Sequence, residues 1–146
     1  MVISNTTRHV GIVVNDLDKT KDFWIKSLGF QLHIKALEQS PYIDELLGIK
    51  DPNLTTVKLI DSKGFIIELL KFNNYQVEKS WSGDLKTTGL THIALTVDNL
   101  DELVDSLKKQ NYQLISEIKI SPNGKVKVVF AKGPEGIMLE LVEELV

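Results

Sequence analysis

The chain has no cysteine among its 146 residues. Disulfide bonds, thiolate metal ligands and cysteine nucleophiles are therefore all excluded. Arginine is almost absent as well, since Arg8 is the single arginine among 17 basic residues. The net charge is −3 and no long run of one sign occurs, so the sequence carries no electrostatic footprint for nucleic acid.

Long apolar runs are also missing. No stretch reaches the length that a membrane span requires, and the N-terminal residues lack the apolar core of a signal peptide. A hydrophobic content of 42% with 25% charged residues is ordinary for a globular protein. We therefore expect one cytoplasmic domain over residues 1–146, with no membrane and no nucleic-acid partner.

Two short apolar stretches of the sequence are near copies of each other. Residues 64–69 read GFIIEL and residues 136–141 read GIMLEL, so that Glu68 corresponds to Glu140. A carboxylate inside an apolar strand is costly unless it is paired or bound to something. Both copies therefore raise the same question about the role of their glutamate.

A second pair of stretches extends the repeat. Residues 8–18 read RHVGIVVNDLD and residues 91–101 read THIALTVDNLD, so that His9 corresponds to His92. Self-similarity on this scale indicates two copies of one supersecondary unit. We expect a first module over residues 8–72, a second module over residues 91–143, and a linker over residues 73–90.

Each module predicts the element order βαβββ. Asp16 and Asn99 are residue types that cap the start of a helix, and Gly29 and Asn111 tolerate the left-handed conformation that ends one. The β-branched and apolar runs of the modules predict strands. These strands are expected at 8–14, 30–35, 54–60 and 65–72, and again at 91–97, 112–120, 125–132 and 136–143.

The first module is longer than the second in one place. From His9 to Glu68 is 59 residues, whereas the matching interval of the second module is 48 residues. The extra 11 residues fall within 36–53, where Ser40 as N-cap, Pro41 as first helical residue and a following glycine indicate a short helix. A binding loop or lid and a plain solvated loop are both consistent with this insertion.

The alternation of strand side chains places both histidines on faces of small residues. His9 shares its face with Gly11, and His92 shares its face with Ala94, while the bulkier residues lie opposite. Two imidazoles and two carboxylates at matched positions predict a metal site formed by His9, Glu68, His92 and Glu140. Such a set suits one divalent ion, with Zn, Ni, Co, Mn and Fe left open.

At these residues the sequence resembles the vicinal oxygen chelate superfamily, which includes glyoxalase I, methylmalonyl-CoA epimerase, extradiol dioxygenases and the bleomycin and fosfomycin resistance proteins. The resemblance covers residues 8–143. It implies an α+β fold in which two βαβββ modules form a curved mixed sheet around a central metal cavity. It also implies that the ligands, from the first and last strands of each module, are His9, Glu68, His92 and Glu140.

The ligand set is most similar to that of glyoxalase I. The resemblance implies a metal-dependent lyase or isomerase that moves a proton through a metal-bound enediolate of a small carbonyl substrate, with Glu140 or Glu68 as the base. An acyl-CoA epimerase and an Fe-dependent dioxygenase are alternatives within the superfamily. A binding or resistance protein without turnover is an alternative of another class. The resemblance also implies a homodimer, with modules paired within one chain or exchanged between two chains.

Overall fold

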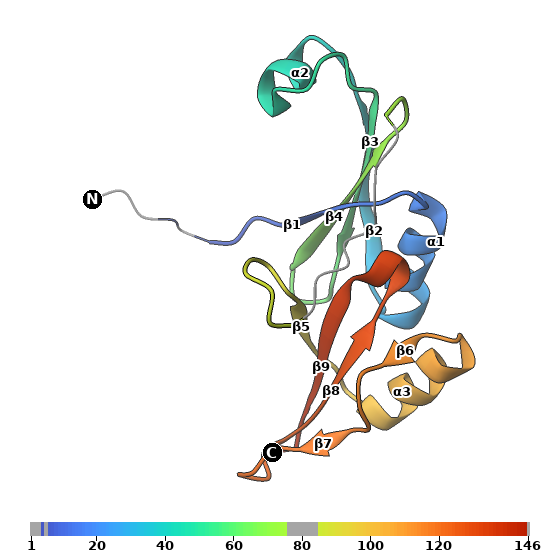
Figure 1. Cartoon of the computed structure of the whole chain (residues 1–146), viewed down its shortest axis with the longest axis vertical. Helices are drawn as coiled ribbons and strands as arrows, with labels where there is room; N and C mark the ends of the chain where they lie inside the picture. Colours follow the sequence, from blue (N-terminus) through green and yellow to red (C-terminus); the bar gives the residue numbers. More distant parts are fainter. Residues whose placement is uncertain (1–3, 5, 76–84, 146) are drawn as a thin grey trace. The chain divides into compact units, whose positions relative to one another are not determined.

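The computed structural model describes residues 4, 6–75 and 85–145 (Figure 1). The chain divides into two compact units, Met1–Ser80 and Trp81–Val146, and each is described by itself. Most of the expected linker, residues 76–84, lies outside the described residues. Both units combine helices with a mixed sheet, so the predicted α+β class is confirmed. No helix of the described residues is long and apolar enough to span a membrane.

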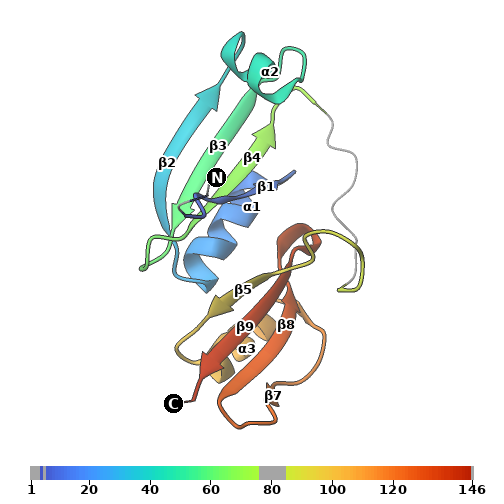
Figure 2. The ribbon, with the colours of Figure 1, turned by 90° about the vertical axis from the view of Figure 1, so that its left-hand side faces the viewer.

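The first unit is built on a four-stranded sheet with the order β1-β4-β3-β2. Strand β1 is parallel to β4, and the other neighbouring strands are antiparallel. Figure 2 shows these strands side by side with helix α1 across one face. The elements are β1 (Val10–Val13), α1 (Leu17–Asp22), the π-helical segment η1 (Phe23–Ser27), β2 (Gln31–Glu38), α2 (Tyr42–Leu47), β3 (Leu54–Ile60) and β4 (Ile66–Phe72).

The core of the first unit lies between the sheet and the helical segment. Ile67 and Leu69 of β4 are fully buried, as is Trp24 of η1. The Trp24 ring meets Phe30 edge to face with the ring centroids 5.0 Å apart. Because side chains alternate along β4, the burial of these two residues directs Glu68 to the opposite face of the sheet.

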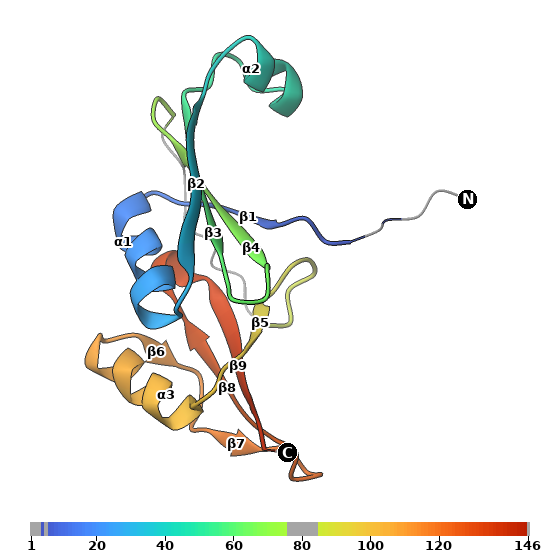
Figure 3. The same cartoon turned by 180° about the vertical axis from the view of Figure 1, so that it is seen from behind.

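The second unit repeats this plan on a five-stranded sheet. The path β5-β9-β8-β6 carries β7 as a further partner of β8, and β5 is parallel to β9. Figure 3 shows helix α3 beside the strands β8 and β9. The elements are β5 (Ile93–Thr96), α3 (Leu100–Lys109), β6 (Gln113–Leu114), β7 (Lys119–Ile120), β8 (Val126–Lys132), the 3₁₀ turn η2 (Pro134–Gly136) and β9 (Met138–Glu144).

The predicted helix ends are confirmed in both units. The Asp16 carboxylate accepts a hydrogen bond from the backbone N–H of Lys19, and the Asn99 side chain accepts one from that of Glu102, each at 3.0 Å. Gly29 and Asn111 follow the helices with φ of 73° and 62°, in the left-handed region. The same local chemistry therefore starts and ends the helix of each unit.

The structure corrects the predicted strand at 112–120. This segment forms two short strands, β6 and β7, with a break between them. Within the break the Ser116 hydroxyl donates a hydrogen bond to the Glu117 carbonyl oxygen. A side chain that bonds to its neighbouring backbone offers that backbone an alternative to the strand ladder.

The insertion of the first unit contains the predicted short helix, α2, but its N-cap is not the expected residue. Pro41 occupies the N-cap position without a side-chain cap, while the Ser40 hydroxyl bonds to the Asp51 carboxylate at 3.1 Å. Gly48 ends the helix in the left-handed conformation, as predicted. Ser40 thus closes the base of the insertion instead of starting the helix.

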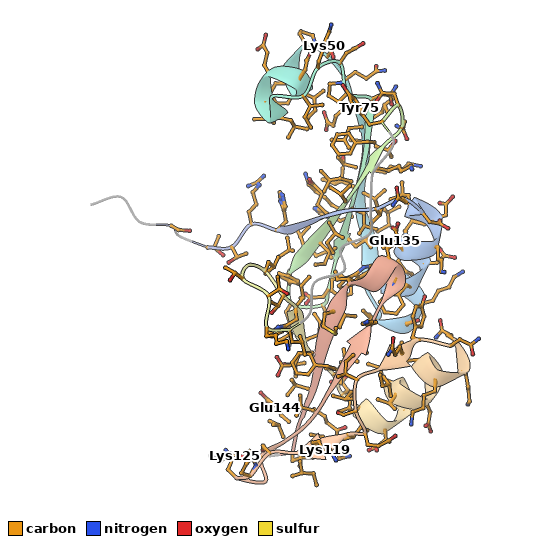
Figure 4. All side chains as sticks on the ribbon, viewed as in Figure 1. Lys50, Tyr75, Lys119, Lys125, Glu135 and Glu144 are labelled. Carbon is orange, nitrogen blue, oxygen red and sulfur yellow. The ribbon has the colours of Figure 1, made fainter. Side chains whose placement is uncertain are left out.

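Side-chain amides hold the C-terminal end of this insertion to the residues that follow β4. Asn73 donates to the Asn53 side chain at 2.7 Å, and Asn74 donates to the Asp51 carbonyl at 2.8 Å. The Tyr75 hydroxyl donates to the carbonyl oxygen of Lys50, and Figure 4 shows both residues beside α2. We call these contacts the amide clamp of the insertion.

Helix α3 is tied to β9 and β8 by one carboxylate. Glu143 accepts a hydrogen bond from the Leu100 backbone N–H at 2.7 Å, and it lies 3.6 Å from the Lys127 ammonium. Lys127 also contacts Asp101, at 2.5 Å. Hydrogen bonding and charge attraction from Asp101, joined by the attraction of Glu143, raise the pKa of Lys127 above its ordinary 10.5.

Replacing Glu143 by alanine is expected to lower the free energy of unfolding by about 1–2 kcal/mol, because the Leu100 N–H at the start of α3 loses its acceptor. Glu143→Gln, which keeps an acceptor oxygen, is expected to cost less. Urea denaturation measures both changes. Glu144→Ala, at an exposed position of the same strand, is the matched control. An equal loss in the control would contradict this role of Glu143.

Candidate metal centre

The first unit brings together two of the four predicted ligands. His9 Nε2 lies 3.8 Å from Glu68 Oε1, and the side chains are 30% and 14% exposed. His9 stands one residue before β1, so the strand is shorter than the predicted range 8–14. Gly11 pairs with Glu68 in the parallel register, which sets the histidine beside the carboxylate.

The second unit forms the matching pair. His92 Nε2 lies 3.2 Å from Glu140 Oε2, with the side chains 35% and 28% exposed. His92 likewise stands one residue before β5, and Ala94 takes the place of Gly11 opposite the carboxylate. The sequence repeat is therefore also a structural repeat: each unit places one histidine beside one glutamate at the same positions of its sheet.

The orientation of His92 is set by two neighbours. The Thr91 hydroxyl lies 2.8 Å from Nδ1, which leaves Nε2 to face Glu140. The Phe130 ring meets the imidazole edge to face, with the centroids 5.2 Å apart and the planes at 80°. A partner on the second nitrogen and a packed ring are the usual means by which proteins orient a histidine ligand.

The separation of the donor atoms fits a shared ion. Two donors that are each about 2.1 Å from one metal, at tetrahedral to octahedral angles, lie about 3.0–3.4 Å apart. The His92–Glu140 separation of 3.2 Å falls in this range, and the His9–Glu68 separation of 3.8 Å lies slightly beyond it. One imidazole and one carboxylate per pair is also a donor set that divalent transition metals accept.

Neither pair is a complete metal site by itself. Within residues 4, 6–75 and 85–145, no group of three or more His, Asp or Glu side chains is assembled to hold an ion. Each unit contributes two donors. The predicted set of four therefore requires both units, and its assembly stays a prediction.

The structure adds one charged residue that the sequence analysis did not select. Lys58 of β3 is the cross-strand partner of Glu68, and its ammonium lies 3.2 Å from Glu68 Oε2. The equivalent partner of Glu140 in the second unit is Phe130. Aligning the repeats beyond their first and last strands would have revealed this exchange of lysine for phenylalanine.

Solved structures with the same fold include glyoxalase family proteins. One from Bacillus cereus superimposes with a TM-score of 0.91 at 24% identity, covering 99% of this chain and 97% of that chain. The glyoxalase I of Leishmania major has a TM-score of 0.68 at 24% identity, covering 97% and 88%. The α+β fold of this chain is the fold of these proteins.

Sequence comparison identifies the family. The model of the Glyoxalase/Bleomycin resistance protein/Dioxygenase superfamily matches residues 8–130, and the chain belongs to this superfamily. It is 28% identical to the lactoylglutathione lyase of Escherichia coli O157:H7, over 93% of this chain and 90% of the relative. It is 31% identical to the human mitochondrial methylmalonyl-CoA epimerase, over 91% and 70%.

The contact between Phe130 and His92 makes a spectroscopic prediction. Phe130→Leu is expected to shift the His92 ring resonances toward those of a solvent-exposed histidine, because the ring current of the phenyl group is removed. Two-dimensional NMR of the three histidines measures the change. His33, an exposed residue of β2, supplies the internal control. An unshifted His92 signal would show that the two rings are not in contact.

Proposed function

We propose that the chain is a metal-dependent lyase or isomerase of the glyoxalase type, which moves a carbon-bound proton next to a carbonyl group. The observation that carries the proposal is the presence of one His–Glu pair at the same position of each repeated unit. We propose further that the two units form one functional domain, in which His9, Glu68, His92 and Glu140 hold one divalent ion. Zn, Ni, Co, Mn and Fe are all compatible with these donors.

A divalent ion at these donors would supply Lewis-acid stabilisation of negative charge on the substrate oxygens. His9 and His92 would act as neutral nitrogen ligands, and Thr91 would fix the orientation of the second. A glutamate that leaves the ion would take the proton from the substrate carbon and return it to the neighbouring position. Apolar neighbours such as Met138, which shares the face of Glu140, would limit the access of water.

The relatives support two reactions of this kind. Lactoylglutathione lyase and methylmalonyl-CoA epimerase are names of relatives with comparable identity to this chain. An epimerisation next to a carbonyl needs the same removal and return of a proton. The epimerase is therefore the second candidate. Arg8 is the single arginine, so lysines would supply most of the positive charge that an anionic substrate needs.

The proposal extends to the substrate class, the cellular location and the oligomeric state of the protein. Superfamily relatives bind small molecules, and we propose a small carbonyl substrate for this chain as well. We propose a cytoplasmic homodimer. The site can then be completed by the second unit of the same chain or by that of the partner.

The proposed ligands make a binding prediction. His92→Ala and Glu140→Gln are each expected to weaken binding of a divalent ion by more than about 100-fold, since loss of a direct ligand exceeds the 10- to 100-fold typical of its supporting residues. Elemental analysis of the purified protein and isothermal titration of the metal-free protein measure the loss. His33→Ala and Glu144→Gln, both at exposed positions, are the matched controls.

A second measurement tests the reaction. The metal-containing protein is expected to convert the hemithioacetal of methylglyoxal and glutathione, or to exchange the acidic carbon-bound proton of a methylmalonyl thioester with deuterated solvent. Chelation is expected to abolish this activity and added divalent ion to restore it. Binding of these compounds without any proton exchange would instead indicate a binding protein.

A further inference from the structure

The two His–Glu pairs differ in one residue that changes their charge. Lys58 and Phe130 occupy the same place in their units, as the antiparallel neighbour of Glu68 and of Glu140 respectively. Lys58 forms an ion pair with Glu68, whereas Phe130 packs against His92. The two units therefore have the same candidate ligands, one histidine and one glutamate, but a different residue next to the glutamate.

This asymmetry decides how much negative charge each pair offers to a cation. The ammonium of Lys58 lies beside the Glu68 carboxylate and balances its charge, whereas the Glu140 carboxylate lies beside the His92 ring. Within the described part of the chain, Glu140 forms no ion pair with a lysine. An incoming cation meets an unbalanced carboxylate in the second unit and a balanced one in the first.

The partial burial of the Lys58–Glu68 pair makes this competition effective. Glu68 is 14% exposed and Lys58 is 30% exposed, so their attraction is less screened than that of a fully exposed pair. The 3.2 Å contact engages Oε2, whereas His9 faces Oε1. The carboxylate can thus turn from the ammonium toward an ion beside His9 without leaving its strand position.

We propose that Lys58 is a positioning residue that makes Glu68 the exchangeable metal ligand and leaves Glu140 as the fixed one. The inference rests on the proposed function, because it assigns different roles to two of its four ligands. Lys58 competes with the ion for Glu68 and receives the carboxylate when the carboxylate leaves.

Titration of the metal-free protein with Co²⁺ tests the role of Lys58. Lys58→Met removes the competing charge and is expected to tighten Co²⁺ binding by roughly 5- to 10-fold. The gain is expected to shrink at high salt, since added ions screen the pair in the wild type. Lys63→Met, which removes a charge from an exposed turn of the same unit, is the control and is expected to stay within about twofold.

A double-mutant cycle separates competition from a general change of charge. Glu68→Gln is expected to weaken Co²⁺ binding several-fold more in the Lys58→Met background than in the wild type, because in the wild type Glu68 is shared between the ion and Lys58. Circular dichroism verifies that each variant is folded. Glu140→Gln is expected to weaken Co²⁺ binding more than Glu68→Gln does in the wild-type background.

Three results would overturn the inference. The first is unchanged or weaker Co²⁺ binding in Lys58→Met. The second is an equal gain of Co²⁺ affinity in Lys63→Met. The third is additive effects of Lys58→Met and Glu68→Gln on Co²⁺ binding. In each of these cases the wild type still binds Co²⁺, so the proposed function survives. Absence of Co²⁺ binding in the wild type and in Lys58→Met would remove the proposed function and the inference together.

Discussion

The parallel pairing of the first and last strands of each unit is the constraint on which the candidate site depends. In an antiparallel hairpin the histidine and the glutamate would come from strands joined by a short turn. Here they come from the two ends of a unit, and the crossover through the helix brings them side by side. The small partners Gly11 and Ala94 leave room beside each carboxylate. A methyl group added at Gly11 would lie 3.3 Å from the Leu70 side chain.

The fixed register also explains how a carboxylate can stay in an otherwise apolar strand. Ile67 and Leu69 flank Glu68, and Leu139 and Leu141 flank Glu140, and all four flanking residues are fully buried. Their burial against the helical layer holds the strand so that the glutamate must face the other way. The alternation of side chains along one strand therefore produces both the hydrophobic core and the polar pair. A shift of the strand register by one residue would destroy both.

Much of this arrangement is predictable from the sequence because it depends on local rules. The repeat, the caps Asp16 and Asn99, the helix ends at Gly29 and Asn111 and the strands 54–60 and 65–72 all follow from periodicity and residue type. The alternation of side chains places His9 with Gly11 and His92 with Ala94, and the exposure of these faces agrees with it.

The remaining features depend on contacts that a one-dimensional pattern does not contain. The break between β6 and β7 contains a local hydrogen bond of Ser116, and Ser40 bonds to Asp51 across the insertion instead of capping α2. Lys58 lies beside Glu68 because of the antiparallel register of β3 and β4, which the sequence pattern does not reveal. The assembly of the two His–Glu pairs into one metal site would require both units, and it stays a prediction.

The amide clamp of the insertion has a consequence for how such a duplicated chain can diverge. Asn53, Asn73 and Asn74 fasten the C-terminal end of the segment beside the end of β4, and Ser40 ties its N-terminal side to Asp51. The segment beyond the clamp can then change in length and in sequence at little thermodynamic cost. One copy of the repeat can thereby change its inserted segment while its sheet keeps the strand pairing that both copies share.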